Sequence, residues 1–206
     1  MSRIVPFNAK TVPLAHQALK DGQLVVLPTD TVYGVAASAR SEAAIDRLYE
    51  AKGRPDDKPI PLLLSDPDRM AVVCAAIPDA ARCLAEHFWP GPLTIVLPKQ
   101  PDLPANLTTL PTVGVRVPDH DLTRAVIRMM GGALAVTSAN ASGGPNPMTV
   151  LDAFKQLGPA VTYYMDDGPA PGGVPSTVVG FDGEGALRIL RPGPITESEM
   201  RAIIGC

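Results

Sequence analysis

The chain has 206 residues, of which 46% are hydrophobic and 19% charged, and its formal net charge at pH 7 is -3. This length suffices for one globular domain with a full core, and the composition excludes a disordered or fibrous chain. Proteins that grip long nucleic acids usually carry a basic excess, so the acidic balance favours a local site for a small anion. No apolar run is long enough to cross a bilayer and no secretion signal precedes the first strand, so we expect a cytoplasmic protein.

Short apolar strands alternate with helical segments nearly from end to end of the chain. In chain order, the expected strands cover residues 4–7, 23–27, 32–37, 61–64, 93–97, 114–117, 134–137, 161–165, 177–181 and 187–190. The expected helices cover residues 12–20, 42–51, 67–75, 79–88, 122–130, 150–157 and 197–204. Ser41 is placed to cap the second helix, and Asp66 followed by Pro67 to cap the third.

This alternation predicts a layered α/β or α+β fold. The last two strands are joined only by a short link through the sequence DGEG, between Phe181 and Leu187. So short a link favours a hairpin over a crossover helix, and the sheet is therefore expected to be mixed, with flanking helices.

The sequence gives little support for a metal site, a disulfide framework or a histidine-based catalytic triad. The three cysteines form no CxxC pair, and Cys74 and Cys83 lie in alanine-rich helical sequence, where a reduced thiol is expected to pack as a small hydrophobe. The histidines are scattered, and the Walker A, GxGxxG, GxSxG and HExxH patterns are all missing from the sequence. We expect no resident metal ion.

A tight basic cluster follows the second helix: Lys52, Arg54 and Lys58 lie within seven residues, with Gly53 and Pro55 between them. Like charges repel, so cations gathered on a loop near the end of a strand suggest a site for an anionic ligand. The alternative is a solvated basic loop whose charge Asp56 and Asp57 balance.

Polar elbows follow several of the apolar strands: PTDT at 28–31, TSAN at 137–140 and PSTVV at 175–179. Loops at strand carboxyl ends converge on the ligand in open α/β sheets, and small hydroxyl and amide groups orient its polar atoms. Arg116 is unusual among the valines of VGVRV. Each of these features also has a purely structural explanation. TSAN could be only a turn, and Arg116 could pair with Asp119 or Asp121. Ser176 could simply begin a strand, and Arg191 could be an ordinary exposed residue.

The motifs PTDTVYG, KGRP, WPGPLTIVL, VRVPDH, SANASG, STVV and ILRPG occur in the order seen in the YrdC-like threonylcarbamoyl-AMP synthases. The chain resembles this family from about Asp21 to Arg191, and it carries both the Lys-x-Arg and the Ser-x-Asn signatures. The resemblance implies a YrdC-like open sandwich with a concave, positively charged pocket. It also implies a single domain spanning residues 1–206, without the second domain of longer members.

The family's reaction joins L-threonine, bicarbonate and ATP into threonylcarbamoyl-AMP and releases pyrophosphate. A partner system then transfers the threonylcarbamoyl group to adenosine 37 of tRNA, giving t6A. The resemblance thus implies a nucleotidyltransferase that works with tRNA-modifying machinery and binds tRNA itself at most weakly. Because the nucleophile is a carbamate formed from the substrates, no activated Ser, Cys or His is required, and magnesium would arrive with the nucleotide.

The resemblance also implies roles for individual residues. Lys52, Arg54, Ser138 and Asn140 would be catalytic, and the threonine pocket would consist of Thr31, Arg116, Val136 and Ser176. The residues expected to hold ATP are Arg54, Lys58, Thr112, Ser138, Asn140, Asn146 and Arg191. Some longer members have a histidine facing threonine where this chain has Leu63.

Two other functions stay open. The first is an RNA-binding module acting on tRNA or ribosomal RNA, against which the acidic balance and the 4% aromatic content speak. The second is a carbamoyl-transferring or adenylate-hydrolysing relative, against which the intact Lys-x-Arg and Ser-x-Asn pairs speak.

Overall fold

The computed structural model describes residues 2–53 and 58–205. Its strands are β1 (Arg3–Pro6), β2 (Val25–Leu27), β3 (Gly34–Ser38), β4 (Leu62–Leu64), β5 (Leu93–Pro98), β6 (Thr112–Arg116), β7 (Ala133–Ser138), β8 (Tyr163–Asp166), β9 (Thr177–Phe181) and β10 (Leu187–Arg191). Its α-helices are α1 (Val12–Lys20), α2 (Glu42–Lys52), α3 (Met70–Val73), α4 (Asp79–Phe88), α5 (Asp121–Met129), α6 (Val150–Leu157) and α7 (Glu197–Ile204). The expected strands and helices are therefore confirmed, apart from shifts at their ends and the third helix.

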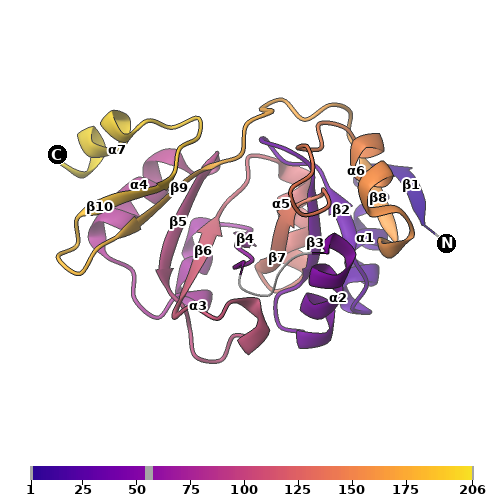
Figure 1. Cartoon of the computed structure of the whole chain (residues 1–206), viewed down its shortest axis with the longest axis horizontal. Helices are drawn as coiled ribbons and strands as arrows, with labels where there is room; N and C mark the ends of the chain where they lie inside the picture. The colour runs from indigo at the N-terminus through magenta and orange to yellow at the C-terminus, as the bar shows by residue number, and fades with distance from the viewer. Residues whose placement is uncertain (1, 54–57, 206) are drawn as a thin grey trace.

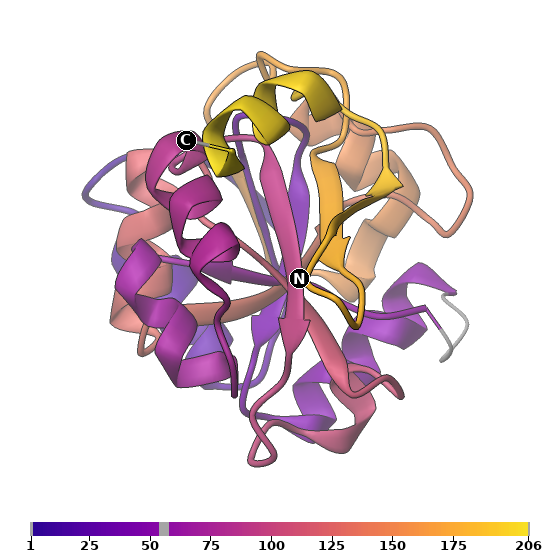
Figure 2. The same ribbon diagram turned by 90° about the vertical axis from the view of Figure 1, so that its left-hand side faces the viewer.

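Over the described residues, the ten strands form one sheet in the order β1-β8-β2-β3-β7-β4-β6-β5-β9-β10, with β1 and β10 at its two edges (Figure 1). The sheet contains both parallel pairs, such as β4 with β6, and antiparallel pairs, such as β3 with β7, so the expected mixed sheet is confirmed. The DGEG hairpin is confirmed too, because β9 and β10 pair antiparallel. The strands fan out across the sheet, as Figure 2 shows from the side.

Three local expectations need correction. The helix expected over residues 67–75 is a 3-10 turn, Pro67–Arg69, followed by the single-turn α3. Asp66 precedes that turn but makes no capping hydrogen bond, and its carboxylate instead pairs with Arg128 at 2.7 Å. Cys74 is buried as expected, and burial raises the pKa of its thiol to about 12, whereas Cys83 is exposed because it falls on the solvent face of α4.

Alternate residues of each strand face opposite sides of the sheet, and the two sides are covered differently. On one side, strand residues such as Val35 and Leu62 join a large core with α2, α3, α4, α6 and α7. On the other side, Ala36 and Leu63 join a smaller core with α1 and α5.

The smaller helix layer leaves part of its side of the sheet open. Helices α1 and α5 pack over β2, β3, β4, β7 and β8. The neighbouring strands β6, β5 and β9 turn Gly114, Val96 and Val178 to the same side, and there these residues line a pocket. Among the described residues, α1 and α5 do not extend over these strands, and this leaves room for a ligand on the sheet surface.

Candidate functional site

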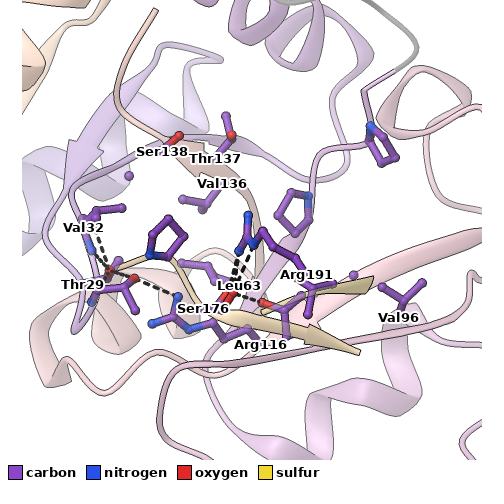
Figure 3. Close-up of a pocket in the computed structure, with 18 of the residues that line it drawn as sticks. Thr29, Val32, Leu63, Val96, Arg116, Val136, Thr137, Ser138, Ser176 and Arg191 are labelled. Carbon is purple, nitrogen blue, oxygen red and sulfur yellow. Dashed lines mark hydrogen bonds between the residues drawn. The ribbon is translucent and has the colours of Figure 1, made fainter. Parts of the chain in front are cut away.

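A pocket of about 520 Å³ occupies the open part of the sheet (Figure 3). Its volume lies within the range of roughly 300–1,000 Å³ that is usual for small-molecule sites. The lining residues come from strands, from the loops after β2 and β7, and from the loops before β4, β6 and β9: Thr29, Thr31, Val32, Gly34, Pro59, Pro61, Leu63, Thr94, Val96, Leu110, Thr112, Gly114, Arg116, Val136, Thr137, Ser138, Asn146, Pro175, Ser176, Val178, Leu190 and Arg191. The pocket lining therefore combines mainly apolar side chains with several hydroxyl groups and two arginines.

Arg116, the last residue of β6, points toward the loop after β2 (Figure 3). Its Nη1 donates to Thr31 Oγ1 at 2.9 Å, its Nη2 to Asp30 Oδ1 at 2.5 Å, and its Nε to the Gly91 carbonyl at 2.9 Å. The side chain is 7% exposed, and burial lowers the pKa of Arg116 while Asp30 opposes that shift. An arginine held this firmly presents a fixed planar fork, which suits a carboxylate ligand.

Neither sequence alternative for Arg116 is its ion-pair partner. Asp30 takes that position, and the backbone N–H of Asp119 donates to the same Asp30 oxygen at 3.0 Å. The other oxygen, Oδ2, is buried and has no hydrogen-bond partner in the described chain. Asp30 thus balances the charge of Arg116 from behind the pocket wall.

The PTDT elbow is fixed by its own hydroxyl groups. Thr29 Oγ1 donates to the Val32 carbonyl at 2.7 Å, accepts from the Thr31 N–H at 3.1 Å and lies 3.0 Å from Thr31 Oγ1. Thr29 and Thr31 are 4% and 2% exposed. This local network sets the Thr31 hydroxyl in place beside Arg116, where it can contact a ligand.

Ser176, directly before β9, is held from two sides. Its Oγ lies 2.8 Å from Thr94 Oγ1 of β5, and Arg191 donates to its carbonyl at 2.7 Å and to its Oγ at 3.1 Å. Arg191 ends β10 and points to Ser176 in Figure 3. Burial lowers the pKa of Arg116, and the charge of Arg191 lowers it further; both arginines line the pocket.

The TSAN segment forms a turn and also supplies pocket residues. Ser138, the last residue of β7, lines the pocket, and its Oγ donates to Asn140 Oδ1 at 2.5 Å. Asn140 is 7% exposed and its Nδ2 donates to the Gly144 carbonyl at 2.7 Å. The turn therefore fixes the Ser138 hydroxyl at the pocket wall.

Lys52 is placed differently from the expected loop cation. It is the last residue of α2, it is 3% exposed, and the helix is closed by Gly53 with a left-handed φ of 55°. Its Nζ donates to the carbonyls of Ser138 and Asn140, and to Asn140 Oδ1 at 3.3 Å. The Lys-x-Arg and Ser-x-Asn signatures thus meet in space through Lys52.

The proline–glycine loop after β8 runs across the elbow and is anchored to it. Tyr33, fully buried, donates from its hydroxyl to the Gly168 carbonyl at 2.6 Å and accepts from the Asp167 N–H at 3.2 Å. The Gly173 N–H donates to the Thr31 carbonyl at 2.9 Å. Pro175 then follows in the pocket wall.

Gly172 makes the close approach of this loop possible, and we expect Gly172→Ala to destabilise the protein. A Cβ at Gly172 would lie 2.6 Å from the Asp30 carbonyl oxygen and 2.9 Å from Thr31 Cα, so the loop or the elbow must move. Overpacking of this kind costs about 1–3 kcal/mol of unfolding free energy, measurable by urea titration. Gly183→Ala is the matched control, since nothing lies within 4 Å of its Cβ. Equal stability of both variants would contradict the close contact.

Most of the candidate residues converge on the pocket. Its lining includes Thr31, Thr112, Arg116, Val136, Ser138, Asn146, Ser176 and Arg191. Lys52 and Asn140 lie behind this wall, and the exposed Lys58 is next to the lining residue Pro59. Arg54, Asp56 and Asp57 lie outside the described residues.

The sequence interpretation missed Thr94, Val96, Leu110, Val178 and Leu190. Thr94 and Val96 read as ordinary residues of an apolar strand, and strand pairing alone brings them beside β6 and β9. Leu110 and Leu190 are 48% and 59% exposed, and single exposed leucines are common on protein surfaces, so nothing in the sequence marks these two as part of a pocket wall.

The charge of the pocket is modest in the described chain. Arg116 and Arg191 are the charged residues among the described lining, and Arg116 is already paired with Asp30. The positively charged pocket therefore stays a prediction. Residues 2–53 and 58–205 contain no group of three or more His, Cys, Asp or Glu that could hold a metal ion. The helices of this part of the chain are too short or too polar to span a membrane.

Fold and pocket together define an α/β domain with a pocket of small-molecule size on the open side of a mixed sheet. Residues 17–193 match the family model Sua5/YciO/YrdC, described as "Telomere recombination". The chain belongs to the Sua5/YciO/YrdC family.

Relatives and solved structures agree with this assignment. The chain is 38% identical over 200 residues to a threonylcarbamoyl-AMP synthase of Bacillus subtilis, covering 96% of this chain but 58% of that protein. It is 40% identical to a putative threonylcarbamoyl-AMP synthase of Mycobacterium tuberculosis, covering 96% of this chain and 91% of the relative. The crystal structure of Pyrococcus abyssi Sua5 complexed with L-threonine is similar with a TM-score of 0.92 and 35% identity, over all of this chain and 60% of that one.

Proposed function

We propose that the chain is an L-threonylcarbamoyladenylate synthase, a nucleotidyltransferase that condenses L-threonine, bicarbonate and ATP. The observation that carries the proposal is the Arg116–Thr31 pair in the pocket wall, 2.9 Å apart. A guanidinium fork beside a hydroxyl matches the carboxylate and hydroxyl of threonine. The similar Pyrococcus abyssi structure contains L-threonine. We also propose that residues 1–206 form a single YrdC-like domain.

In the proposed complex, Arg116 and Ser176 bind the threonine carboxylate, Thr31 contacts the threonine hydroxyl, and Val136 packs against the substrate. Leu63, 6% exposed, offers apolar surface beside Arg116, its partner in the register of β4 with β6. The threonine amine would then face the open part of the pocket, where bicarbonate and the nucleotide enter.

The nucleotide would lie along the rest of the wall. Thr112, Ser138 and Asn146 line it, and Asn140 supports Ser138 from behind. Arg54 and Lys58 are proposed to hold the phosphates and Arg191 to close over the nucleotide. Lys52 Nζ donates to the carbonyls of Ser138 and Asn140, and this supports a positioning role for Lys52 in place of the direct catalytic role that the resemblance implies.

The chemistry then needs alignment and charge compensation. The threonine amine attacks bicarbonate to give a carbamate and water, and a carbamate oxygen attacks the α-phosphorus of ATP. The bond to the β-phosphate breaks and pyrophosphate leaves. Fixed cations stabilise the charge that develops on the phosphoryl oxygens. Magnesium would enter on the nucleotide, since the described residues offer no carboxylate cluster to hold it.

The proposal is tested with purified protein by measuring pyrophosphate release. We expect release only when L-threonine, bicarbonate and ATP are all present, and mass spectrometry should detect threonylcarbamoyl-AMP. ATP hydrolysis that ignores threonine would contradict the proposal. The cytoplasmic location, the hand-over to a tRNA-modifying partner and weak tRNA binding stay predictions.

The names of the relatives favour the synthase over the RNA-binding module. A titration with tRNA at several salt concentrations separates the two functions. Tight, salt-dependent RNA binding by a protein that releases no pyrophosphate would favour the module.

A further inference from the structure

Two buried hydroxyl groups form part of the pocket wall, Thr94 Oγ1 and Ser176 Oγ, and they lie 2.8 Å apart. Their residues are 6% and 5% exposed. A hydroxyl has one proton to donate and two lone pairs with which it accepts. Arg191 Nη2 is a pure donor and uses one lone pair of Ser176 Oγ at 3.1 Å.

The two hydroxyls together have one proton more than the described chain can accept. One proton lies in the hydrogen bond between them. Within residues 2–53 and 58–205, neither oxygen has a further partner besides Arg191. The second proton must therefore point to the pocket, because both residues line it.

The surroundings indicate which residue presents that proton. A Cβ at Gly114 would lie 3.1 Å from Thr94 Cγ2, so the Thr94 methyl faces β6 and its hydroxyl faces Ser176 on the opposite neighbour of β5. Ser176 lies beside both arginines in Figure 3, where an anionic ligand oxygen would be attracted. A proton on Ser176 has such an acceptor within reach when ligand is bound.

We propose that Thr94 donates to Ser176 Oγ and thereby turns the Ser176 proton into the pocket, toward a carboxylate oxygen of the amino-acid substrate. With Thr94 and Arg191 both donating, the lone pairs of Ser176 are occupied, and Ser176 can act toward the ligand only as a donor. Thr94 is thus a positioning residue that acts through Ser176. This inference rests on the proposed function for the identity of the substrate.

The restriction of Ser176 to a donor role affects which ligand groups the pocket can bind. A carboxylate accepts from both Arg116 and Ser176, whereas a group that must itself donate finds no acceptor on Ser176. The Thr94–Ser176 pair would therefore help the pocket to select a carboxylate at this end of the ligand.

The test is calorimetric titration of L-threonine in the absence of ATP, with Thr94→Val, Thr94→Ser, Ser176→Ala and the double variant. We expect Thr94→Val to weaken threonine binding about three- to tenfold, the range of one neutral hydrogen bond. Ser176→Ala should weaken it more, by about tenfold or above, because a bond to a charged acceptor is stronger. Thr94→Ser keeps the hydroxyl and should bind within about twofold of the wild type.

The double variant provides the readout that a merely structural role would not give. If Thr94 acts through Ser176, Thr94→Val has no further effect in the Ser176→Ala background. An equal loss in both backgrounds, a larger loss for Thr94→Val than for Ser176→Ala, or unchanged binding by Thr94→Val would each overturn the inference. Threonine binding without threonine-dependent pyrophosphate release would contradict the proposed function alone, and absence of binding by the wild type would remove both.

Discussion

Arg116→Ala is expected to remove measurable L-threonine binding and to lower kcat/KM for threonine by a factor on the order of 10²–10³. Arg116 is the one described guanidinium that bonds to the Thr31 elbow inside the pocket, and it is fixed by Asp30 and the Gly91 carbonyl. A variant without it offers a carboxylate no planar donor at that place. Arg116→Lys keeps a charge but loses the fork, and it should recover only part of the activity.

The stability of the Arg116 variant has to be separated from its binding. Removing Arg116 leaves Asp30 nearly buried without its counter-charge, which costs about 3–5 kcal/mol when a buried pair is broken. The double variant Asp30→Ala with Arg116→Ala lacks the unpaired charge, so it should regain much of that stability and still fail to bind threonine. Arg40→Ala, which breaks the exposed pair with Asp102, serves as the control with little effect. Wild-type threonine affinity in Arg116→Ala or in the double variant would contradict the proposed binding of the threonine carboxylate by Arg116.

Lys52→Met is expected to lower both stability and turnover. The Lys52 ammonium bonds to the carbonyls of Ser138 and Asn140 and to the Asn140 side chain in a buried position. Methionine has similar length but no donor, so these oxygens lose a charged hydrogen-bond donor, at a cost of about 2–4 kcal/mol in unfolding free energy. The Ser138 turn would then be loosened, and turnover should fall about 10²-fold because small misplacements at a reacting centre have large effects.

Lys20→Met is the matched control for this prediction. Lys20 also ends a helix, α1, but it is exposed. Urea unfolding and pyrophosphate release should be close to wild type in this variant. If Lys52→Met binds ATP and turns over as well as Lys20→Met, the positioning role of Lys52 is wrong.

Periodicity gave the positions of nearly all elements because hydrophobic residues recur at the spacing of the structure they form. Ser41 illustrates this: it caps α2 with its side chain accepting from the Ala44 N–H, as its place before an amphipathic segment predicts. The prediction of one helix over residues 67–75 needed correction, because this segment forms a 3-10 turn followed by the short helix α3. Local patterns do not contain the tertiary contact with Arg128 that occupies the Asp66 carboxylate.

Many residues of the pocket lining were predicted from the sequence, but their arrangement was not. Loops at strand carboxyl ends were expected to converge, yet Thr112 begins β6 while Arg116 ends it, and both line the pocket. Ser138 ends β7, whereas Ser176 precedes β9. The pocket extends over one side of a mixed sheet, and strand direction therefore does not decide which residues reach it.

By itself, the sequence determined the alternating strands and helices, the closing hairpin, and the family motifs that carry most of the pocket residues, because these depend on neighbours along the chain. The tertiary structure alone decided that Asp30 pairs with Arg116, that Lys52 turns inward to hold the Ser138 turn, and that Thr94 meets Ser176. Each of these contacts joins residues more than 80 positions apart in the sequence. Such pairs form only when the strand order of the sheet is set, and that order follows from the packing of the whole core.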